Sequence, residues 1–184
     1  MTIEERYDEI TGVASRILPY RIRPAQKPDL NAYLEKSPES ICPFCPDLFE
    51  KLTPKFPPEI TEEGKFRRGK ACLFPNAFPY DTANSVAIFS FSHLLALDQL
   101  TPEEMRDGFA VCRDYFQRIA ELQKGYQYCS INWNYMPPAG GGLIHPHLQT
   151  IAGVRPTNFM RRILESASNY EILSNGGHLW RNLL

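Results

Sequence analysis

The sequence predicts an α+β fold, in which one main helix packs on one face of an antiparallel sheet. Three observations predict this class. Segments rich in strand formers flank a long amphipathic pattern, this pattern begins with a helix-capping motif, and the order strand, strand, helix, strand, strand is typical of α+β domains. The chain has 184 residues, 43% hydrophobic and 22% charged, which is enough for a substantial buried core. We expect a single domain over residues 1–184.

The first third of the chain is expected to hold little regular structure. Residues 2–10 indicate a short opening helix. Residues 19–31 hold three prolines among basic side chains and cannot continue a helix, so they predict an extended, basic loop. A second proline-rich loop is expected from Thr53 to Gly64.

The middle of the chain carries the clearest elements. Ala71–Phe74 and Ser85–Phe91 are rich in strand formers. The sequence from Thr101 to Glu104 combines a capping box with proline at the first helical position, and Gly125 suits the end of the helix that starts there. The expected apolar stripe of this helix comprises Met105, Phe109, Cys112, Phe116 and Ile119.

The last third is expected to complete the sheet. Tyr126–Asn134 indicates one strand, and a glycine turn leads into another that runs to about Ala152. With the two earlier strands they form an antiparallel meander. Residues 156–168 indicate a second amphipathic helix, and residues 170–184 indicate a turn that leads into a new apolar segment.

Bulk properties exclude several classes of partner. A formal net charge of −1 offers no general attraction to nucleic acid or to an anionic membrane. The chain holds no apolar run of membrane-spanning length, and its N-terminus is charged where a signal peptide needs an apolar core. We therefore expect a cytoplasmic protein without nucleic-acid or membrane partners. Its five cysteines include a C-x-x-C pair, which in a reducing compartment indicates metal or redox chemistry.

Two of the four histidines lie two residues apart, in the segment from Leu143 to Gln149. If this segment is extended, Leu143, His145, His147 and Gln149 point to the same face. The three glycines just before it, residues 140–142, allow unusual backbone angles or a close approach to a ligand. The alternative is a surface strand that carries histidines without a function.

The C-x-x-C pair, Cys42 and Cys45, has the spacing of a zinc knuckle and needs two more ligands for tetrahedral closure. His93 and His145 are the candidates, and such a Cys₂His₂ set would hold zinc in a closed, structural site. Three alternatives stay open: a redox pair, two buried cysteines without a ligand, and a knuckle that has lost its metal.

Several motifs together resemble galactose-1-phosphate uridylyltransferases, of the histidine-triad superfamily. They are Cys-Pro-Phe-Cys-Pro from Cys42, Asn-Ala-Phe-Pro from Asn76, Ser-Phe-Ser-His ending at His93, and the stretch from Asn134 to His-Pro-His-Leu-Gln ending at Gln149. The resemblance implies a histidine-triad-like sheet with a zinc knuckle. It also implies that zinc is bound by Cys42, Cys45, His93 and His145.

The resemblance assigns catalysis to His147 and Gln149. His147 would attack the α-phosphate of a nucleotide sugar and form a covalent nucleotidyl-histidine. A sugar 1-phosphate would then take the nucleotidyl group, which the resemblance implies to be UMP. Gln149 stands where hydrolases of the superfamily carry a third histidine. Because an amide is no acid at neutral pH, it favours transfer over hydrolysis.

The remaining site residues are also implied by the resemblance. Asn134 and Gln149 match groups around the phosphates, Asn76 matches a group near the ribose, and Arg21 and Arg23 match basic residues near the nucleotide. Gly142 departs from the family, which tends to have a serine that touches the phosphates there.

Uridylyltransferases contain two related halves, and this chain resembles the first half only. The resemblance therefore implies either a second half, toward which residues 170–184 lead, or a homodimer. The expected function is nucleotidyl transfer in galactose metabolism. Two alternatives are a hydrolase or phosphorylase of the same superfamily, and a zinc-stabilised nucleotide-binding half-domain without catalysis.

Overall fold

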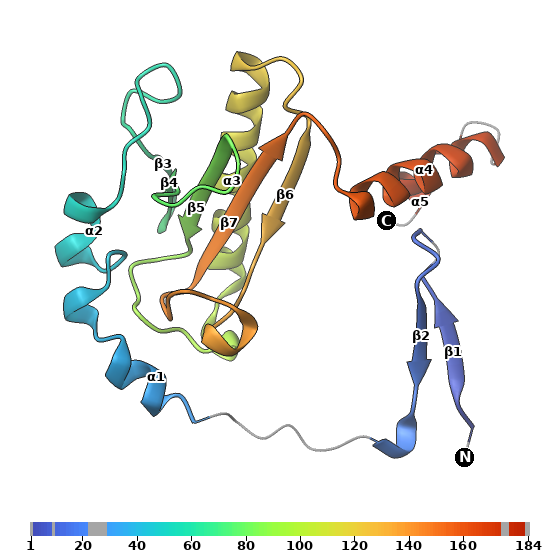
Figure 1. The fold of residues 1–184 in the computed structure, drawn as a ribbon, viewed down its shortest axis with the longest axis horizontal. Helices are drawn as coiled ribbons and strands as arrows, with labels where there is room; N and C mark the ends of the chain where they lie inside the picture. The colour runs from blue at the N-terminus through green and yellow to red at the C-terminus, as the bar shows by residue number, and fades with distance from the viewer. Residues whose placement is uncertain (1, 9, 22–28, 174–176, 183–184) are drawn as a thin grey trace. The chain divides into compact units, whose positions relative to one another are not determined.

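The computed structural model describes residues 2–8, 10–21, 29–173 and 177–182 (Figure 1). Among them no helix is long and apolar enough to cross a membrane. The strands are β1 (Glu4–Tyr7), β2 (Ala14–Ile17), β3 (Phe66–Arg68), β4 (Ala71–Pro75), β5 (Ala83–Ile88), β6 (Tyr128–Asn132) and β7 (His147–Gly153). The α-helices are α1 (Asn31–Lys36), α2 (Pro46–Leu52), α3 (Pro102–Leu122), α4 (Asn158–Leu173) and α5 (Leu179–Asn182).

The chain forms two compact units, one of residues 29–155 and one of residues 1–28 with 156–184. The larger unit holds the five-stranded sheet together with α1, α2 and α3. The smaller unit holds the β1–β2 hairpin together with α4 and α5. The single domain over residues 1–184 stays a prediction.

The main sheet is antiparallel throughout, and its strand order is β3-β4-β5-β7-β6 (Figure 1). The expected meander is therefore wrong in one respect: β6 is an edge strand, and β7 lies between β5 and β6. The chain leaves β5, passes through α3 to the far edge, and then returns. This path places the histidine strand β7 in the interior of the sheet, with a neighbour on each side.

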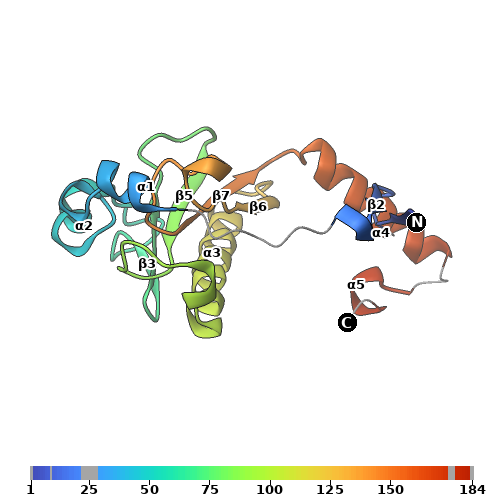
Figure 2. The same ribbon diagram turned by 90° about the horizontal axis from the view of Figure 1, so that it is seen from below.

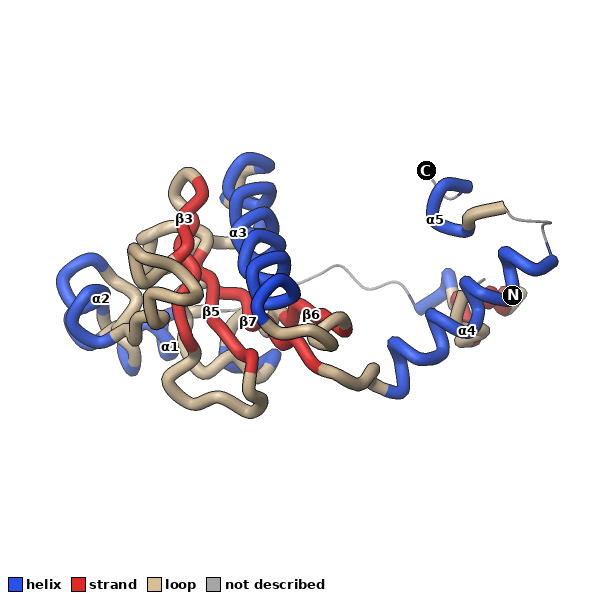
Figure 3. Tube along the Cα trace, turned by 90° about the horizontal axis from the view of Figure 1, so that it is seen from above, coloured by secondary structure: helices blue, strands red, loops and turns tan. Residues whose placement is uncertain are grey.

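Helix α3 covers one face of the sheet, as the sequence predicts (Figures 2 and 3). Its capping box is formed: the Thr101 hydroxyl accepts the Glu104 amide, and the Glu104 carboxylate accepts the Thr101 amide. The expected stripe is partly wrong, since Phe109 is 41% exposed. Cys112 and Ile119 are buried as expected, and Met105 and Phe116 pack against the core. Gly108, Val111 and Tyr115 are buried as well.

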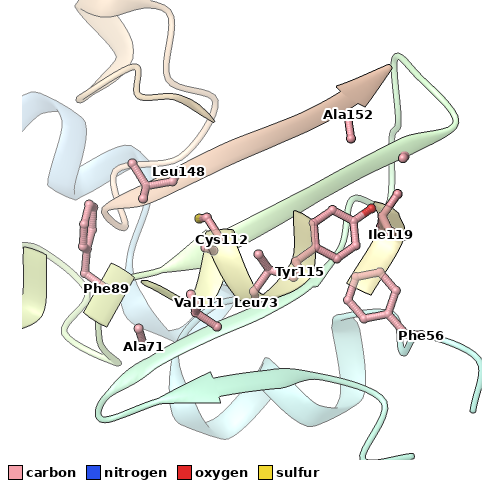
Figure 4. Packing of buried hydrophobic residues seen from close by; sticks show 12 residues of the cluster. Phe56, Ala71, Leu73, Phe89, Val111, Cys112, Tyr115, Ile119, Leu148 and Ala152 are labelled. Carbon is pink, nitrogen blue, oxygen red and sulfur yellow. The ribbon is translucent and has the colours of Figure 1, made fainter. Parts of the chain in front are cut away.

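Side chains from β4, β5 and β7 complete the core below α3 (Figure 4). Leu73, Ala87 and Leu148 are fully buried on this face, beside Val111 and Cys112 of the helix. Because strand residues alternate between faces, their neighbours in sequence point to the other side of the sheet.

The opposite face of the sheet holds a second apolar cluster, which carries the cysteine pair. Cys72, Phe74, Val86 and Ile88 supply the strand side of this cluster, and Cys42, Phe44, Cys45 and Phe49 pack against them. Cross-strand register places His147 beside Ile88 and Gln149 beside Val86 on this same face. The knuckle and the two polar residues of β7 therefore share one side of the sheet.

Two expected elements are corrected. The opening segment is strand β1, paired with β2, and not a helix. The Asp8 carboxylate accepts the amides of Ile10 at 3.1 Å and Thr11 at 2.6 Å, so local turn chemistry outweighs helix propensity there. The histidine strand starts at His147 instead of Leu143, because Pro146 has no amide to donate to the sheet.

Candidate functional site

Four buried side chains converge into one possible metal site: Cys42, Cys45, His93 and His145. One ligand atom from each of them lies within 4.8 Å of all the others. The Cys45 sulfur is 3.2 Å from Nδ1 of His93 and 3.8 Å from Nδ1 of His145. The geometry thus brings together the four residues for which the sequence predicts a metal.

Local structure explains how each ligand reaches the cluster. A 3-10 turn at Glu39–Ile41 ends at Cys42, and Cys45 is the N-cap of α2, whose first residue is proline. The Cys45 amide donates to the Cys42 carbonyl at 3.2 Å, which closes a tight turn between the two thiols. His93 follows β5, and His145 directly precedes β7.

Both histidines of the cluster direct Nδ1 toward the sulfurs and use Nε2 elsewhere. Nε2 of His93 donates to the Ser37 carbonyl at 2.7 Å, and Nε2 of His145 donates to the Ser90 carbonyl at 2.9 Å. Such outer hydrogen bonds fix the tautomer and the ring orientation of a metal-ligating histidine. The unprotonated Nδ1 atoms are then left to bind an ion.

The chemistry of the donor set fits zinc. Without an ion, burial raises the pKa of the Cys45 thiol to about 12, and the neighbouring Cys42 adds to this shift. Burial also lowers the pKa of His145 to about 4, so its imidazole is neutral. Two thiols and two neutral imidazoles in a closed, buried set match a structural tetrahedral site, in which the metal displaces the thiol protons.

His147 is the first residue of β7 and is 7% exposed. Its Nδ1 donates to the backbone carbonyl of His145 at 2.8 Å. Burial lowers the pKa of His147, against the opposing effect of that hydrogen bond. The ring is therefore a neutral imidazole near pH 7, whose Nε2 carries the free lone pair.

Nε2 of His147 is accessible as well as unbonded. In the described part of the chain, Nε1 of Trp133 is the only side-chain nitrogen or oxygen that is both buried and without a hydrogen-bond partner, so the unbonded Nε2 of His147 is not buried. The side chain of His147 lines a cavity of about 470 Å³ on the knuckle face of the sheet. A nucleophilic nitrogen at the wall of a cavity can attack a bound electrophile.

The rest of the cavity wall is mostly apolar, with a polar end. Pro43 and Phe44 of the knuckle form one side, and the polar end includes Gln149, Asn76 and Tyr80. The other lining residues are Leu52, Thr53, Pro54, Phe74, Ala77, Phe78, Val86, Gly142 and Leu143. Among these described residues there is no lysine or arginine.

Two polar residues that the sequence analysis missed organise this end. The buried Asn84 donates to the Thr150 carbonyl at 2.6 Å and accepts from Nδ2 of Asn76 at 2.8 Å. The Tyr80 hydroxyl donates to Oε1 of Gln149. The strand residue Asn84 could have been expected from its polar character in an apolar strand, whereas Tyr80 only follows the Asn-Ala-Phe-Pro motif and is not part of it.

Asn76 lines the cavity, but both ends of its amide are already engaged. Nδ2 donates to Asn84, and Oδ1 accepts the Phe78 amide at 3.0 Å. One N–H and one lone pair stay free for a ligand. The side chain thus shapes the loop as well as facing the cavity.

Asn134 is exposed and is not among the residues that line the cavity. Its carbonyl lies 2.6 Å from the place that a Cβ at Gly141 would take, so only glycine fits there. Gly142 lines the cavity with open space around it. Asn132, which the sequence analysis did not single out, is the cross-strand partner of Gln149. A contact of Asn134 with the phosphates stays a prediction.

Of the two predicted arginines, the structure describes Arg21. Arg21 ends the 3-10 turn Pro19–Arg21 and belongs to the smaller unit. Arg23 lies outside the described residues. Their contact with a nucleotide stays a prediction.

Comparison with known sequences gives one relative and no family. No family model matches the chain. An uncharacterized protein of Archaeoglobus fulgidus is 33% identical over 181 residues, which are 98% of this chain and 53% of that protein. The chain thus spans about half the length of the curated relative that it matches.

Comparison with solved structures is more specific. An ADP-glucose phosphorylase from Arabidopsis thaliana, solved with bound ADP-glucose, matches with a TM-score of 0.64 at 18% sequence identity. The match covers 95% of this chain and 56% of the phosphorylase chain. A GalT-like protein from the same plant has a TM-score of 0.60 at 18% identity, with 95% and 55% covered. At this identity the likeness concerns the fold. The chain therefore shares its fold, over 95% of its length, with an ADP-glucose phosphorylase and a GalT-like protein, as the resemblance of its motifs predicts.

Proposed function

We propose that this chain transfers a nucleoside monophosphate from a nucleotide sugar to a hexose 1-phosphate through a covalent intermediate on His147. The observation that carries the proposal is the state of His147. Its Nδ1 is held by the His145 carbonyl, its Nε2 is unprotonated, and its side chain lines a cavity. This is the arrangement that a nucleophilic imidazole needs.

The first step forms a bond between Nε2 of His147 and the α-phosphorus. The bond from that phosphorus to the bridging oxygen breaks, and sugar 1-phosphate leaves with its electrons. As Nε2 becomes bonded to phosphorus, the ring gains positive charge, which the His145 carbonyl stabilises by accepting from Nδ1. In the second step an incoming hexose 1-phosphate attacks the phosphorus, and Nε2 leaves.

The cavity supports the proposal by its shape and its polar end. An apolar wall of Pro43, Phe44 and Phe74 suits a base, and Asn76 and Gln149 supply hydrogen bonds. In this proposal Gln149 donates to a phosphoryl oxygen, where charge builds in the transition state. As an amide it cannot act as an acid for water attack, which favours transfer over hydrolysis.

Zinc enters the proposal as a scaffold. Cys42, Cys45, His93 and His145 would hold it, and it would supply rigidity without an open coordination position. The protein itself would then hold His147 in place, because His147 follows the metal ligand His145 by two residues.

The test is intact-mass spectrometry of the chain after incubation with UDP-glucose or ADP-glucose. We expect a nucleoside monophosphate adduct on the unchanged chain and on His178→Ala, a control with an exposed histidine, and none on His147→Ala. The adduct mass identifies the nucleotide; the resemblance favours UMP. If no nucleotide sugar gives an adduct, or if the adduct persists in His147→Ala, the proposal is wrong.

A phosphorylase is the second candidate, because the fold is shared with an ADP-glucose phosphorylase. The two candidates differ in the acceptor. Discharge of the adduct by hexose 1-phosphate yields a nucleotide sugar, whereas discharge by inorganic phosphate yields a nucleoside diphosphate. Incubating the isolated adduct with each acceptor in turn separates them.

A further inference from the structure

Tyr80 contacts one of the two residues proposed to act on the phosphate. It lies in the loop between β4 and β5, lines the cavity, and donates its hydroxyl hydrogen to Oε1 of Gln149. No motif in the sequence points to this contact, and no other hydrogen bond of the Gln149 side chain is present among the described residues. In the orientation that the structure shows, the Tyr80 hydroxyl donates to Oε1, which leaves the NH₂ group of Gln149 without a partner among the described residues.

We propose that Tyr80 is a positioning residue, which holds the Gln149 amide with its NH₂ group available to the phosphate. A side-chain amide has a donor end and an acceptor end, and they exchange places when the group turns over. With Oε1 bound to Tyr80, only the N–H bonds are left to meet a phosphoryl oxygen. In the reverse orientation the amide oxygen would face the negative phosphate and repel it.

The position of Tyr80 is itself fixed, although 61% of the residue is exposed. Its backbone amide donates to Oδ1 of Asn84 at 3.4 Å. Asn84 is 5% exposed and is anchored to the carbonyl of Thr150, the residue that follows Gln149 on β7. The loop that carries Tyr80 is thus connected to β7 at two neighbouring residues, at Thr150 through Asn84 and at Gln149 directly. The Tyr80 hydroxyl therefore contacts Gln149 without first having to order a free loop.

The absence of cations from the cavity wall increases the importance of this orientation. Among the described residues that line the cavity there is no lysine or arginine, so the hydrogen-bond donors that this part of the wall offers to a phosphate are neutral. A donor that is already oriented costs no reorganisation as charge develops. The inference rests on the proposed function in one respect, since it takes Gln149 to be the phosphate donor.

The test is a double-mutant cycle with Tyr80→Phe and Gln149→Ala. Tyr80→Phe removes only the hydroxyl, and we expect adduct formation to slow about 10-fold, the size of one hydrogen bond. In the Gln149→Ala background, the same change is expected to have no further effect, because Tyr80 acts through Gln149. Tyr135→Phe is the control: its hydroxyl donates to the Leu95 carbonyl, away from the cavity. An equal loss with and without Gln149 would overturn the proposal.

A second measurement does not depend on catalysis. The side-chain amide resonances of Gln149, assigned by their loss in Gln149→Ala, are expected to shift in Tyr80→Phe and not in Tyr135→Phe. Unchanged resonances in Tyr80→Phe show that Tyr80 does not orient the amide. If the unchanged chain forms no adduct while the resonances do shift, the proposed function fails and the positioning by Tyr80 stands.

Discussion

Nδ1 of His147 lies 2.8 Å from the backbone carbonyl oxygen of His145, the residue whose own imidazole lies in the Cys₂His₂ cluster. The two histidines are thus connected in two ways, through Pro146 and through this hydrogen bond. His145 is fully buried, and its Nε2 is held by the Ser90 carbonyl. Whatever fixes His145 therefore also fixes the ring of His147.

The first prediction concerns the metal. Cys42→Ala is expected to abolish stoichiometric zinc, measured by elemental analysis, and to lower the free energy of unfolding. A metal present at 100 times its dissociation constant stabilises by about 2.7 kcal/mol, so the loss is expected to be at least of this size. Cys112→Ala removes an equally buried thiol on the buried face of α3 and is expected to retain zinc. Full zinc in Cys42→Ala would show that the four residues do not form the site.

The second prediction concerns Phe44, which lies between the two cysteines of the knuckle. Its ring makes edge contacts with His145, at 5.7 Å between centroids, and with His147, at 5.5 Å. Phe44→Leu is expected to slow adduct formation on His147 about 10-fold, because a loosely held nucleophile loses its alignment.

Phe49 supplies the matched control for Phe44. It is buried in the same cluster and contacts Phe74 and Phe91, but no contact with a histidine is present among its ring pairs. Phe49→Leu is expected to lower the melting temperature without slowing the adduct step in the protein that stays folded. If the two variants lose activity to the same extent, Phe44 contributes to stability only.

The larger part of the fold could be predicted from local patterns. The capping box at Thr101 predicts the start of α3, and apolar strand-forming segments predict β4 and β5, because these signals depend on neighbouring residues. The place of β7 between β5 and β6 could not be predicted. It depends on where the chain returns after α3, and no local pattern records that path.

The site divides in the same way. The cluster at Cys42, Cys45, His93 and His145 could be predicted, because few residue types bind zinc and the resemblance supplies the set. Asn84 could have been suspected from its polar character in an apolar strand, but its hydrogen bond to the Thr150 carbonyl could not be predicted. Tyr80 could not be predicted at all, because its role follows from a contact between a loop and Gln149 of β7. The strand alternation assumed for His145 fails because Pro146 delays the start of β7.

The third prediction concerns the capping box of α3 and its dependence on pH. The Thr101 amide and hydroxyl hold the pKa of Glu104 below its usual value, against the effect of burial. A carboxyl whose pKa is lower in the folded state stabilises the fold fully above about pH 4.3, and this contribution is lost as the pH falls below that value.

Two substitutions test the capping box. Thr101→Ala is expected to cost about 1 kcal/mol at neutral pH, measured by denaturant unfolding. Glu104→Gln can keep the hydrogen bond to the Thr101 amide but cannot titrate, so it is expected to show a weaker loss of stability below about pH 4.3. Equal acid sensitivity with and without Glu104 would contradict the assignment.

The fourth prediction concerns Gly108, which lies on the buried face of α3. In most helices Gly→Ala stabilises by about 1 kcal/mol. At Gly108 a Cβ would lie 2.5 Å from Cδ1 and 2.7 Å from Cε1 of Phe89, so the aromatic ring must move. Gly108→Ala is therefore expected to destabilise by about 1–3 kcal/mol, the usual cost of overpacking a core.

A side chain without a ring at position 89 separates this clash from other causes. Phe89→Leu alone is expected to destabilise through lost packing, but Gly108→Ala in that background is expected to cost much less than in the unchanged chain. Gly142→Ala is the control, because no atom lies within 4 Å of the Cβ that it adds. The measurement is the free energy of unfolding of the four proteins of the cycle. If the cost of Gly108→Ala is independent of Phe89, the close approach of α3 to this ring does not limit the packing of the helix.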